Sequence, residues 1–239
     1  MIIEVLFPEL CNLYGDAMNA EYLHRTVPYC EFRKTSLKTQ PAFAEKTVDF
    51  IYLGSMSETG QELATKALRQ HRERLSALID SGCVILATGN AMDLFGTHIE
   101  NEDGSFIETL GLFNMYSKRQ MMRRYSSIYL GSFGDMDIVG FKSQFAHNYD
   151  NNDSSIPALF ETVRGAGRRP GQKEEGVRLN NFFATNILGP LLILNPPFTR
   201  FLLNLLGVHS YVLPYENEIL TAYNARLSEF KDPKTGTEY

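Results

Sequence analysis

The stretch "ILATGNAMDLFG", residues 85–96, joins an apolar run to a Gly-Asn turn and then to the apolar start of a helix. A buried strand that turns sharply into a helix is typical of a nucleophile elbow, in which the residue at the turn is exposed above the sheet. Open α/β sheets bind ligands at the carboxyl ends of their strands. The stretch therefore predicts an α/β fold with a ligand site at this turn, and it raises the question of which residue acts there.

The segments around this turn alternate between strand and helix patterns. Three apolar, β-branched runs predict buried strands: residues 1–7, 48–54 and 83–89. Apolar residues at helical spacing predict a helix over 17–27 that Asp16 caps, a long helix over 59–82, and the start of another at 91–99. Such alternation indicates an α/β sandwich built on a mostly parallel sheet.

The chain from about Arg124 onward is richer in strand patterns than in helix patterns. Four runs predict strands there: residues 126–133, 135–145, 176–188 and 209–215. The polar segment 149–176 is expected to be mostly loop, and 216–230 to be the last helix. We expect one domain over residues 1–230, followed by a flexible tail over 231–239.

The composition limits the classes of function. The chain has 239 residues, of which 44% are hydrophobic, and a formal net charge of −5, so nothing attracts it as a whole to nucleic acid or to an anionic membrane. The apolar stretch 189–208 is interrupted by Asn195 and Arg200, which argues against a membrane span and favours core plus a covered loop. The cysteines lack pair or metal-ligand spacing, and no signal-peptide pattern opens the chain, so a cytoplasmic location is expected.

Basic residues gather in two local clusters. The first consists of Lys118, Arg119, Arg123 and Arg124, and the second of Arg164, Arg168 and Arg169. Clusters of this kind can bind phosphate, although most charged runs on a protein surface are simply solvated. Both clusters are therefore kept as candidate interfaces.

Five blocks of the sequence carry a family resemblance. They are "FPELCNLYGDAMN" (7–19), "DFIYLGSMSETGQE" (49–62), "VILATGNAMDLFG" (84–96), "IVGFKSQFA" (138–146) and "EEGVRLNNFFATNILGPLLILNPPF" (174–198). In this order they resemble class I glutamine amidotransferases of the lipid II isoglutaminyl synthase (GatD) and cobyric acid synthase (CobB/CobQ) type. The resemblance implies a flavodoxin-like three-layer sandwich over nearly the whole chain. It also implies a cysteine thiolate that attacks the glutamine amide, a histidine that transfers protons, and backbone N–H groups that hold the oxyanion.

The catalytic positions implied by this resemblance are altered. The nucleophile position falls on Gly89, which has no side chain. The histidine of the closing block falls on Leu188, and the histidine of the middle block falls on Gln144. The Gly-rich loop is reduced to "GSM" at 54–56, which also alters the oxyanion side. We expect a turn that has lost its nucleophile and no intact set of catalytic residues.

Other residues with suitable chemistry are poorly placed to replace the missing groups. Cys83 starts the elbow strand and is expected in the core, far from Gly89. Cys11 follows the first strand, but nothing near it in the sequence would lower the pKa of its thiol. Thr88 has a hydroxyl without a base, and His147 is expected to be a surface histidine.

A substrate pocket is implied along the first three blocks. Its candidate residues are Asn12, Tyr14, Asp16, Gly54, Ser55, Thr88, Asn90 and Ala91. The backbone N–H groups of Asn90 and Ala91, at the start of the expected helix, are suited to a carboxylate or a phosphate. Neither a metal nor a cofactor is expected.

Three functions remain open at this stage. The first is a degenerate, non-hydrolytic subunit or paralogue that acts with a Mur-ligase-like synthetase or with a second copy of the chain. The second is an active glutaminase subunit that supplies ammonia for amidation of a cell-wall precursor or a cobyric acid-type substrate. The third is a small-ligand sensor that uses the old pocket. Loss of both the cysteine and the histidine favours the first.

A docking surface for such a partner is expected on the apolar run 191–208. Five large side chains follow helical spacing there: Phe198, Phe201, Leu202, Leu205 and Leu206. This is more apolar surface than one covered stripe of a helix requires, so part of it is expected to be exposed.

Overall fold

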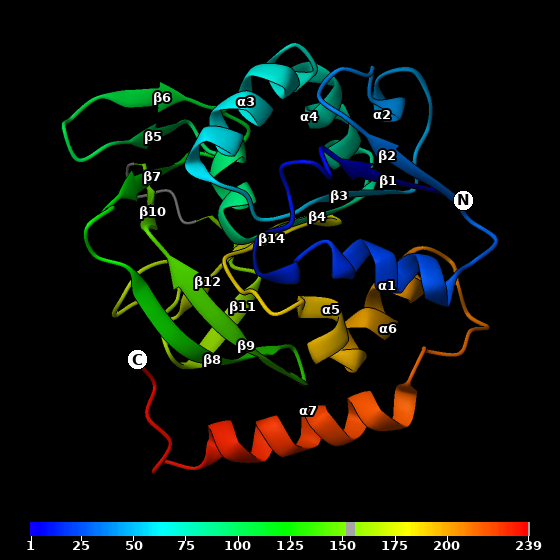
Figure 1. Cartoon of the computed structure of the whole chain (residues 1–239), viewed down its shortest axis with the longest axis vertical. Helices are drawn as coiled ribbons and strands as arrows, with labels where there is room; N and C mark the ends of the chain where they lie inside the picture. The colour runs from blue at the N-terminus through cyan, green and yellow to red at the C-terminus, as the bar shows by residue number, and fades with distance from the viewer. Residues whose placement is uncertain (152–155, 239) are drawn as a thin grey trace.

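The computed structural model describes residues 1–151 and 156–238, and its centre is a six-stranded sheet in the order β13-β14-β4-β3-β1-β2 (Figure 1). The strands are β1 (Ile2–Leu6), β2 (Glu31–Thr35), β3 (Phe50–Leu53), β4 (Val84–Thr88), β13 (Val177–Leu179) and β14 (Phe182–Thr185). Every neighbouring pair is parallel except β13 with β14. The carboxyl ends of the parallel strands therefore open on one edge of the sheet.

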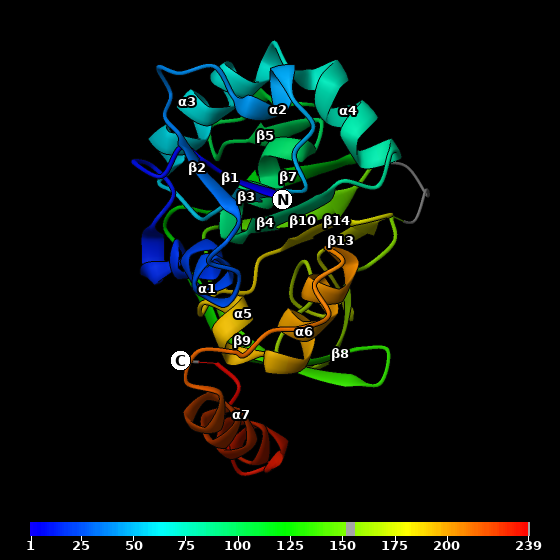
Figure 2. The same ribbon diagram turned by 90° about the vertical axis from the view of Figure 1, so that its right-hand side faces the viewer.

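Helices cover both faces of this sheet and make three layers (Figure 2). On one face lie α2 (Ala42–Glu45), α3 (Glu58–Arg69) and α4 (Arg72–Asp80), and on the other lie α1 (Met18–Thr26), α5 (Leu191–Leu194) and α6 (Pro196–Leu205). Successive residues of β3 alternate between the two cores, because Ile51 packs on the first face and Phe50 on the second. The predicted three-layer α/β fold is confirmed.

Two smaller sheets contain the other strands. The chain after Arg124 is β-rich, as the sequence predicts, but the first of these sheets also takes three strands from residues 98–119, where no strand is predicted. The first has the order β10-β7-β5-β6, with β5 (His98–Glu100), β6 (Phe106–Glu108), β7 (Met115–Arg119) and β10 (Ala146–Asp150). The second has the order β12-β11-β8-β9, with β8 (Tyr125–Phe133), β9 (Met136–Gln144), β11 (Phe160–Arg164) and β12 (Glu174–Glu175). The β8–β9 hairpin pairs without a break from Tyr125↔Gln144 to Phe133↔Met136.

The helices on either side of the elbow differ from the prediction. The long helix expected over 59–82 is two helices, because α3 ends at Arg69 and α4 starts only at Arg72. This break lets both halves bury apolar residues, such as Leu68 and Leu75, in the same core. After the elbow the chain forms only a 3₁₀ helix, η2 (Gly89–Phe95), since Thr97 already donates its N–H to Met115 O of β7 at 2.7 Å.

The expectations for two segments of the second half are wrong in part. Residues 209–215 form no strand and lead into α7 (Glu216–Lys231), whose bounds agree closely with the last predicted helix. The expected loop 149–176 contains β11 and β12, which pair with each other and extend the β8–β9 hairpin. Residues 152–155 of this loop lie outside the described part of the chain.

The apolar run 191–208 is mostly core, and only its outer edge around Leu205 is exposed. Phe198 and Leu202 on α6 are fully buried. The Phe198 ring contacts an aromatic cluster contributed by Phe133, Phe160, Phe183 and Phe201. Leu205, on the outer side, is 37% exposed. The run is unusually apolar because α6 is covered both by the sheet and by the β8–β9 hairpin.

Residues 231–238, which the sequence suggests are a tail, form hydrogen bonds with the rest of the described chain. Arg164 donates hydrogen bonds to the carbonyl oxygens of Phe230 and Asp232, both at 2.6 Å. The N–H of Ile128 on β8 donates to Thr237 O at 2.9 Å. These bonds hold the chain end against the β8–β9 hairpin, as Figure 1 shows. In the described part of the chain, none of the helices has the length and apolarity that crossing a bilayer requires.

Candidate functional site

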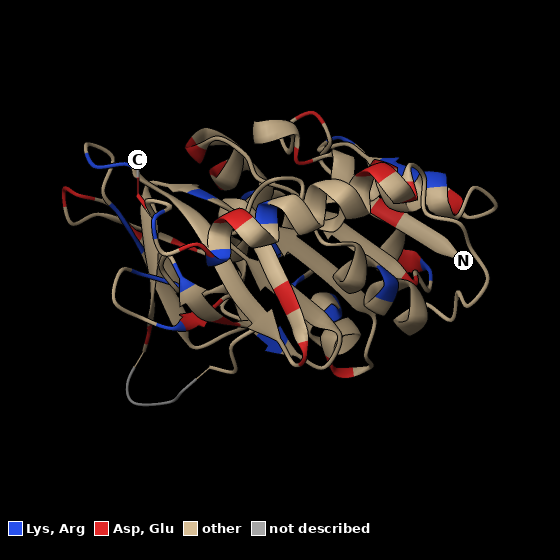
Figure 3. Cartoon of the chain, turned by 90° about the horizontal axis from the view of Figure 1, so that it is seen from below, with Lys and Arg blue, Asp and Glu red and all other residues tan. Residues whose placement is uncertain are grey.

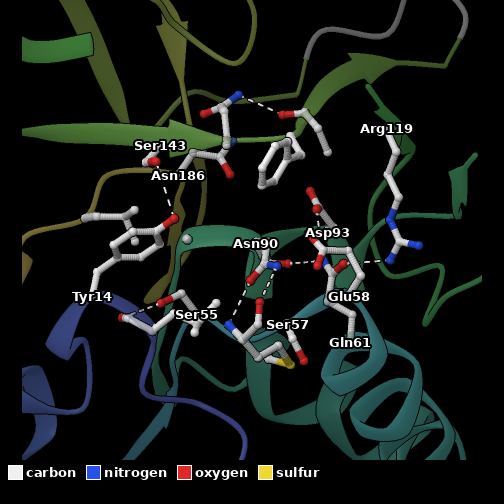
Figure 4. A pocket seen from close by; sticks show the side chains of 17 residues that line it. Tyr14, Ser55, Ser57, Glu58, Gln61, Asn90, Asp93, Arg119, Ser143 and Asn186 are labelled. Atoms are coloured by element: carbon white, nitrogen blue, oxygen red, sulfur yellow. Dashed lines mark hydrogen bonds between the residues drawn. The ribbon is translucent and has the colours of Figure 1, made fainter. Parts of the chain in front are cut away.

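A pocket of about 130 Å³ opens beside the elbow turn, at the carboxyl ends of β3 and β4 (Figure 4). Its walls come from the loop after β1 with its short 3₁₀ helix η1 (Leu13–Gly15), from the start of α3, from η2 and from the chain that follows β9. Four positions singled out by the sequence line it together: Ser55, Gly89, Gln144 and Leu188. The structure thus brings together the loop ends whose convergence the resemblance implies.

Gly89 has a left-handed conformation and no room for a side chain. Its φ is +60°, a value that glycine adopts freely and other residues adopt only with strain. A Cβ atom added to Gly89 would lie 2.5 Å from Ser55 Cβ and 3.0 Å from Leu188 Cδ2. The elbow keeps the sharp turn that presents a nucleophile, but Ser55 and Leu188 occupy the space that a nucleophile would need.

The two positions at which the resemblance implies a histidine hold groups that accept no proton near neutral pH. Leu188 is buried and is anchored by its N–H, which donates to Phe141 O at 2.8 Å. Gln144 donates through Nε2 to Ala146 O at 2.8 Å and contacts His147 Nδ1 at 3.0 Å. Its Oε1 is buried and has no hydrogen-bond partner among the described residues. Neither residue can act as a general base.

The backbone N–H groups of the Gly54 loop are occupied. Ser55 donates its N–H to Asp16 Oδ2 at 2.8 Å. Met56 donates its N–H to Asn90 Oδ1 at 3.0 Å, and Asn90 Nδ2 donates in return to Met56 O at 2.7 Å. An oxyanion hole requires donors that point at the reacting oxygen. These two N–H groups instead fasten the loop to the opening segment and to η2.

Asp16 does not cap α1, although the sequence predicts that it does. No side-chain bond caps this helix, and Asp16 is completely buried behind the pocket. Its Oδ2 accepts from Thr88 Oγ1 at 2.5 Å, and its Oδ1 accepts from Asn19 Nδ2 at 2.9 Å. Burial raises the pKa of the Asp16 carboxyl, and the hydrogen bonds from Thr88 and Ser55 oppose this shift. The carboxylate therefore locks three strand-end loops to one another.

The candidate pocket residues divide into two groups. Tyr14, Ser55 and Asn90 line the pocket. The others lie behind or beside its wall: Asn12, Asp16, Gly54, Thr88 and Ala91. Thr88 is held by Asp16 and by Tyr52, whose hydroxyl lies 2.8 Å from Thr88 Oγ1. In the described ranges, no three His, Cys, Asp or Glu side chains come close enough to hold a metal ion.

The sequence analysis missed a polar cluster around Asp93, which lines the floor of the pocket. Asp93 Oδ1 accepts from Ser117 Oγ at 2.7 Å and from Asn148 Nδ2 at 2.6 Å. Oδ2 accepts from Gln61 Nε2 at 3.1 Å, and Gln61 Oε1 in turn accepts from Arg119 at 2.8 Å. Burial raises the pKa of Asp93, and these hydrogen bonds oppose the shift. The one signal in the sequence is a carboxylate within the apolar start of the expected helix.

The other residues that could replace the missing catalytic groups are unsuited to that role. Burial raises the pKa of the Cys11 thiol to about 12 and that of the Cys83 thiol to about 11, so neither is a thiolate at neutral pH. His147 is 7% exposed, so the expectation of a surface histidine is wrong. It is buried because β10 packs it against Gln144, and it lines a second pocket on the other side of that residue.

Comparison with known proteins places these features among amidotransferases. Residues 2–193 match the family model of the CobB/CobQ-like glutamine amidotransferase domain. Subunit GatD of lipid II isoglutaminyl synthase (glutamine-hydrolyzing) from Staphylococcus aureus is 26% identical over 199 residues, covering 80% of this chain and 78% of that protein. The same subunit from Streptococcus pneumoniae is 25% identical over 195 residues, covering 80% of this chain and 74% of that protein.

The fold agrees with solved structures at lower sequence identity. A crystal structure of a glutamine amidotransferase superimposes with a TM-score of 0.58 at 13% identity, covering 86% of this chain and all of that one. At this identity the likeness concerns the fold alone. It supports the three-layer architecture independently of the sequence match.

Proposed function

This chain belongs to the CobB/CobQ-like glutamine amidotransferase family, and we propose that it is a member that no longer hydrolyses glutamine. In this proposal the protein keeps the amidotransferase fold and acts as a degenerate subunit or paralogue. The observation that carries the proposal is the environment of Gly89. A missing side chain alone would leave a gap, whereas here Ser55 and Leu188 fill the space.

The chemistry of the pocket wall supports the same proposal. A serine nucleophile needs a base within hydrogen-bond reach. Ser55 Oγ donates to Leu13 O at 2.9 Å, Ser143 Oγ lies 3.3 Å from the Tyr14 hydroxyl, and Ser57 Oγ accepts from Gly60 N at 3.1 Å. The Ser55 side chain also reaches the buried Asp16 carboxylate, but that carboxylate already accepts from Thr88 Oγ1 and from the Ser55 N–H. We infer that Asp16 holds the loops together and does not act as a base for Ser55.

A partner is the second part of the proposal. Both curated relatives are named as subunits, so an assembly with another protein is the expected state of a chain with this fold. We propose a Mur-ligase-like synthetase as this partner, acting on a cell-wall precursor in the cytoplasm, or else a second copy of this chain. Because most of the large side chains of α6 are buried, this helix offers such a partner only its outer edge around Leu205.

Co-expression tests the partner proposal. The chain is expressed with a Mur-ligase-like synthetase of its own organism, and the product is analysed by size-exclusion chromatography with light scattering. A stable heteromer is the expected result. A chain that remains monomeric alone, and also in the presence of the synthetase, would contradict this part of the proposal while leaving the loss of hydrolysis to be measured separately.

A small-ligand sensor is the second candidate, because the pocket remains open although its chemistry is lost. Polar groups of Asn90, Asn186 and Arg119 line it, and the unpaired Oε1 of Gln144 lies in its wall. Titration calorimetry with glutamine and glutamate tests this reading. Saturable binding that Asn90→Ala abolishes would favour the sensor, and the absence of heat with both amino acids would exclude them as ligands.

A further inference from the structure

The structure separates the two basic clusters into arginines that are engaged and arginines that are free. Four of the seven basic residues have internal partners: Lys118 with Glu100, Arg119 with Gln61 and Asn101, Arg164 with carbonyl oxygens after α7, and the buried Arg168 with Asp150. The other three, Arg123, Arg124 and Arg169, form no ion pair with a carboxylate in residues 1–151 and 156–238. Basic segments of the chain lie near the C-terminus in Figure 3.

These three arginines converge on one pocket of about 340 Å³, although they come from segments far apart in the sequence. Arg123 and Arg124 lie between β7 and β8, and Arg169 follows β11. His147 and Tyr149 of β10 also line this pocket. The cations of a merely solvated charged run have no reason to meet, whereas these three arginines line one concave site.

Aromatic rings hold two of the arginines in place. The guanidinium of Arg169 lies 4.7 Å from the ring centre of Tyr149, which stacks at 5.3 Å on Tyr116. Arg124 lies 5.5 Å from the ring of Phe145 and donates a hydrogen bond to the Tyr14 hydroxyl. Stacking restricts the side chains before a ligand arrives, so less conformational entropy is lost on binding.

The charge of this pocket is positive and largely uncompensated. Among the described residues that line it, Glu238 is the one acidic residue, and it accepts a hydrogen bond from the Tyr125 hydroxyl at 3.3 Å. Lys142, behind the wall, is neutralised by its buried ion pair with Glu175. Burial, and after it the charges of Lys142 and Arg123, lower the pKa of His147, so its imidazole adds no charge at neutral pH.

We propose that this second pocket binds a phosphate-bearing small molecule, with Arg123, Arg124 and Arg169 as the groups that hold the phosphate. Planar guanidinium groups donate paired hydrogen bonds to phosphate oxygens and remain charged at any physiological pH. The volume lies within the range of small-molecule sites, about 300–1,000 Å³, and exceeds what one inorganic ion needs. The site therefore suits a diphosphate or a phosphate ester.

The phosphate pocket adjoins the elbow pocket. Gln144 lines the elbow pocket and contacts His147 of the phosphate pocket, and Arg124 of the phosphate pocket is bonded to Tyr14 of the elbow pocket. A ligand in one pocket therefore touches residues that shape the other. This inference does not depend on the loss of glutamine hydrolysis.

Calorimetry at constant ionic strength tests the inference with three probes: inorganic phosphate, pyrophosphate and a nucleoside diphosphate. We expect pyrophosphate to bind, and both Arg123→Gln and Arg169→Gln to weaken its binding about tenfold or more each. The matched control is Arg25→Gln on α1, an exposed arginine whose removal should leave binding unchanged. Thermal unfolding of each variant confirms that the exposed substitutions leave the fold intact.

The probes also distinguish the source of the phosphate. Equal affinity for pyrophosphate and the nucleoside diphosphate would support the proposal and identify the diphosphate as the recognised group. Tighter binding of the nucleoside diphosphate would also support it and identify an organic phosphate as the ligand. Absence of binding by all three probes would overturn the proposal. Binding that the two pocket variants leave unchanged, or that Arg25→Gln weakens equally, would overturn it as well.

Discussion

At position 89 the neighbouring side chains occupy the space where a nucleophile would stand. The closest of them, Ser55, comes from the loop after β3, and Leu188 comes from the closing block. The backbone nevertheless keeps the left-handed turn, with φ at +60°. Gly89 thus explains both why the turn is kept and why the nucleophile is lost. Glycine adopts this turn without strain, and without a side chain it leaves room for its neighbours.

Substitution of Gly89 measures how closed this space is. We expect Gly89→Ala to lower the free energy of unfolding by about 2–4 kcal/mol, from backbone strain plus overlap with Ser55 and Leu188. The matched control is Gly134→Ala, at φ +56° with no atom within 4 Å of an added Cβ, which should cost about 1 kcal/mol from strain alone. Urea denaturation of both variants measures the two losses. Equal losses in the two variants would show that position 89 still has room for a side chain.

Asp93 predicts a pH dependence of stability. Burial raises the pKa of this carboxyl above its usual 3.8, so between that value and the folded-state pKa the folded protein binds more protons than the unfolded chain. Its contribution to stability therefore falls as the pH rises through this window. Asp93→Asn removes this loss, so the stability of the variant relative to wild type should increase from pH 4 upward. A stability difference that stays constant or decreases over that range would contradict the direction of the shift.

At the scale of elements, hydrophobic periodicity predicts whether a segment is a helix or a strand. It predicts less well where that element packs. Hydrophobic spacing located α1, α7 and the strands β1, β3 and β4, because each buries one stripe or one run of apolar residues. It failed to break the helix between α3 and α4, since the turn at His71 leaves the apolar spacing almost continuous. It also did not show how much of α6 is buried, because the hairpin that packs on this helix lies elsewhere in the sequence.

Two alanine substitutions on α6 separate core from surface. Phe198→Ala should lower the free energy of unfolding by about 3–5 kcal/mol, because a fully buried ring is removed from the aromatic cluster. Leu205→Ala, on the same helix at 37% exposure, should cost markedly less. Denaturant unfolding of both variants provides the test. Comparable small losses would restore the expectation of an exposed docking helix.

The buried pair of Lys142 and Glu175 joins β9 to β12 and to the closing block. Glu175 Oε1 also accepts from Thr185 Oγ1 and from Asn186 N, both at 2.8 Å. Lys142→Met should cost about 3–5 kcal/mol, because it leaves a buried carboxylate without its cation. The control Lys231→Met breaks the exposed pair with Asp137 and should cost about 0–1 kcal/mol. Similar costs for the two substitutions would mean that the inner pair is not isolated from water.

At the scale of the whole molecule, the sequence predicted the three-layer sheet and the convergence of its strand-end loops, but not the interior of the site. The order of the matched sequence blocks predicts which loops meet. For this reason the sequence correctly placed Gly89 and Leu188 next to each other. The cluster around Asp93 draws Ser117 and Asn148 from strands of a separate sheet, and no local spacing announces such contacts. The convergence of Arg123 and Arg169 depends equally on tertiary structure.

The assay of ammonia release from glutamine by the purified chain, alone and with a co-expressed synthetase, tests the central claim most directly. Because Gly89 cannot attack and Leu188 cannot accept a proton, we predict no release above that of a denatured control in either case. Cys11→Ser should leave this result unchanged, since burial raises the pKa of that thiol to about 12. Release well above the control, abolished by Cys11→Ser, would contradict the claim and identify Cys11 as the nucleophile.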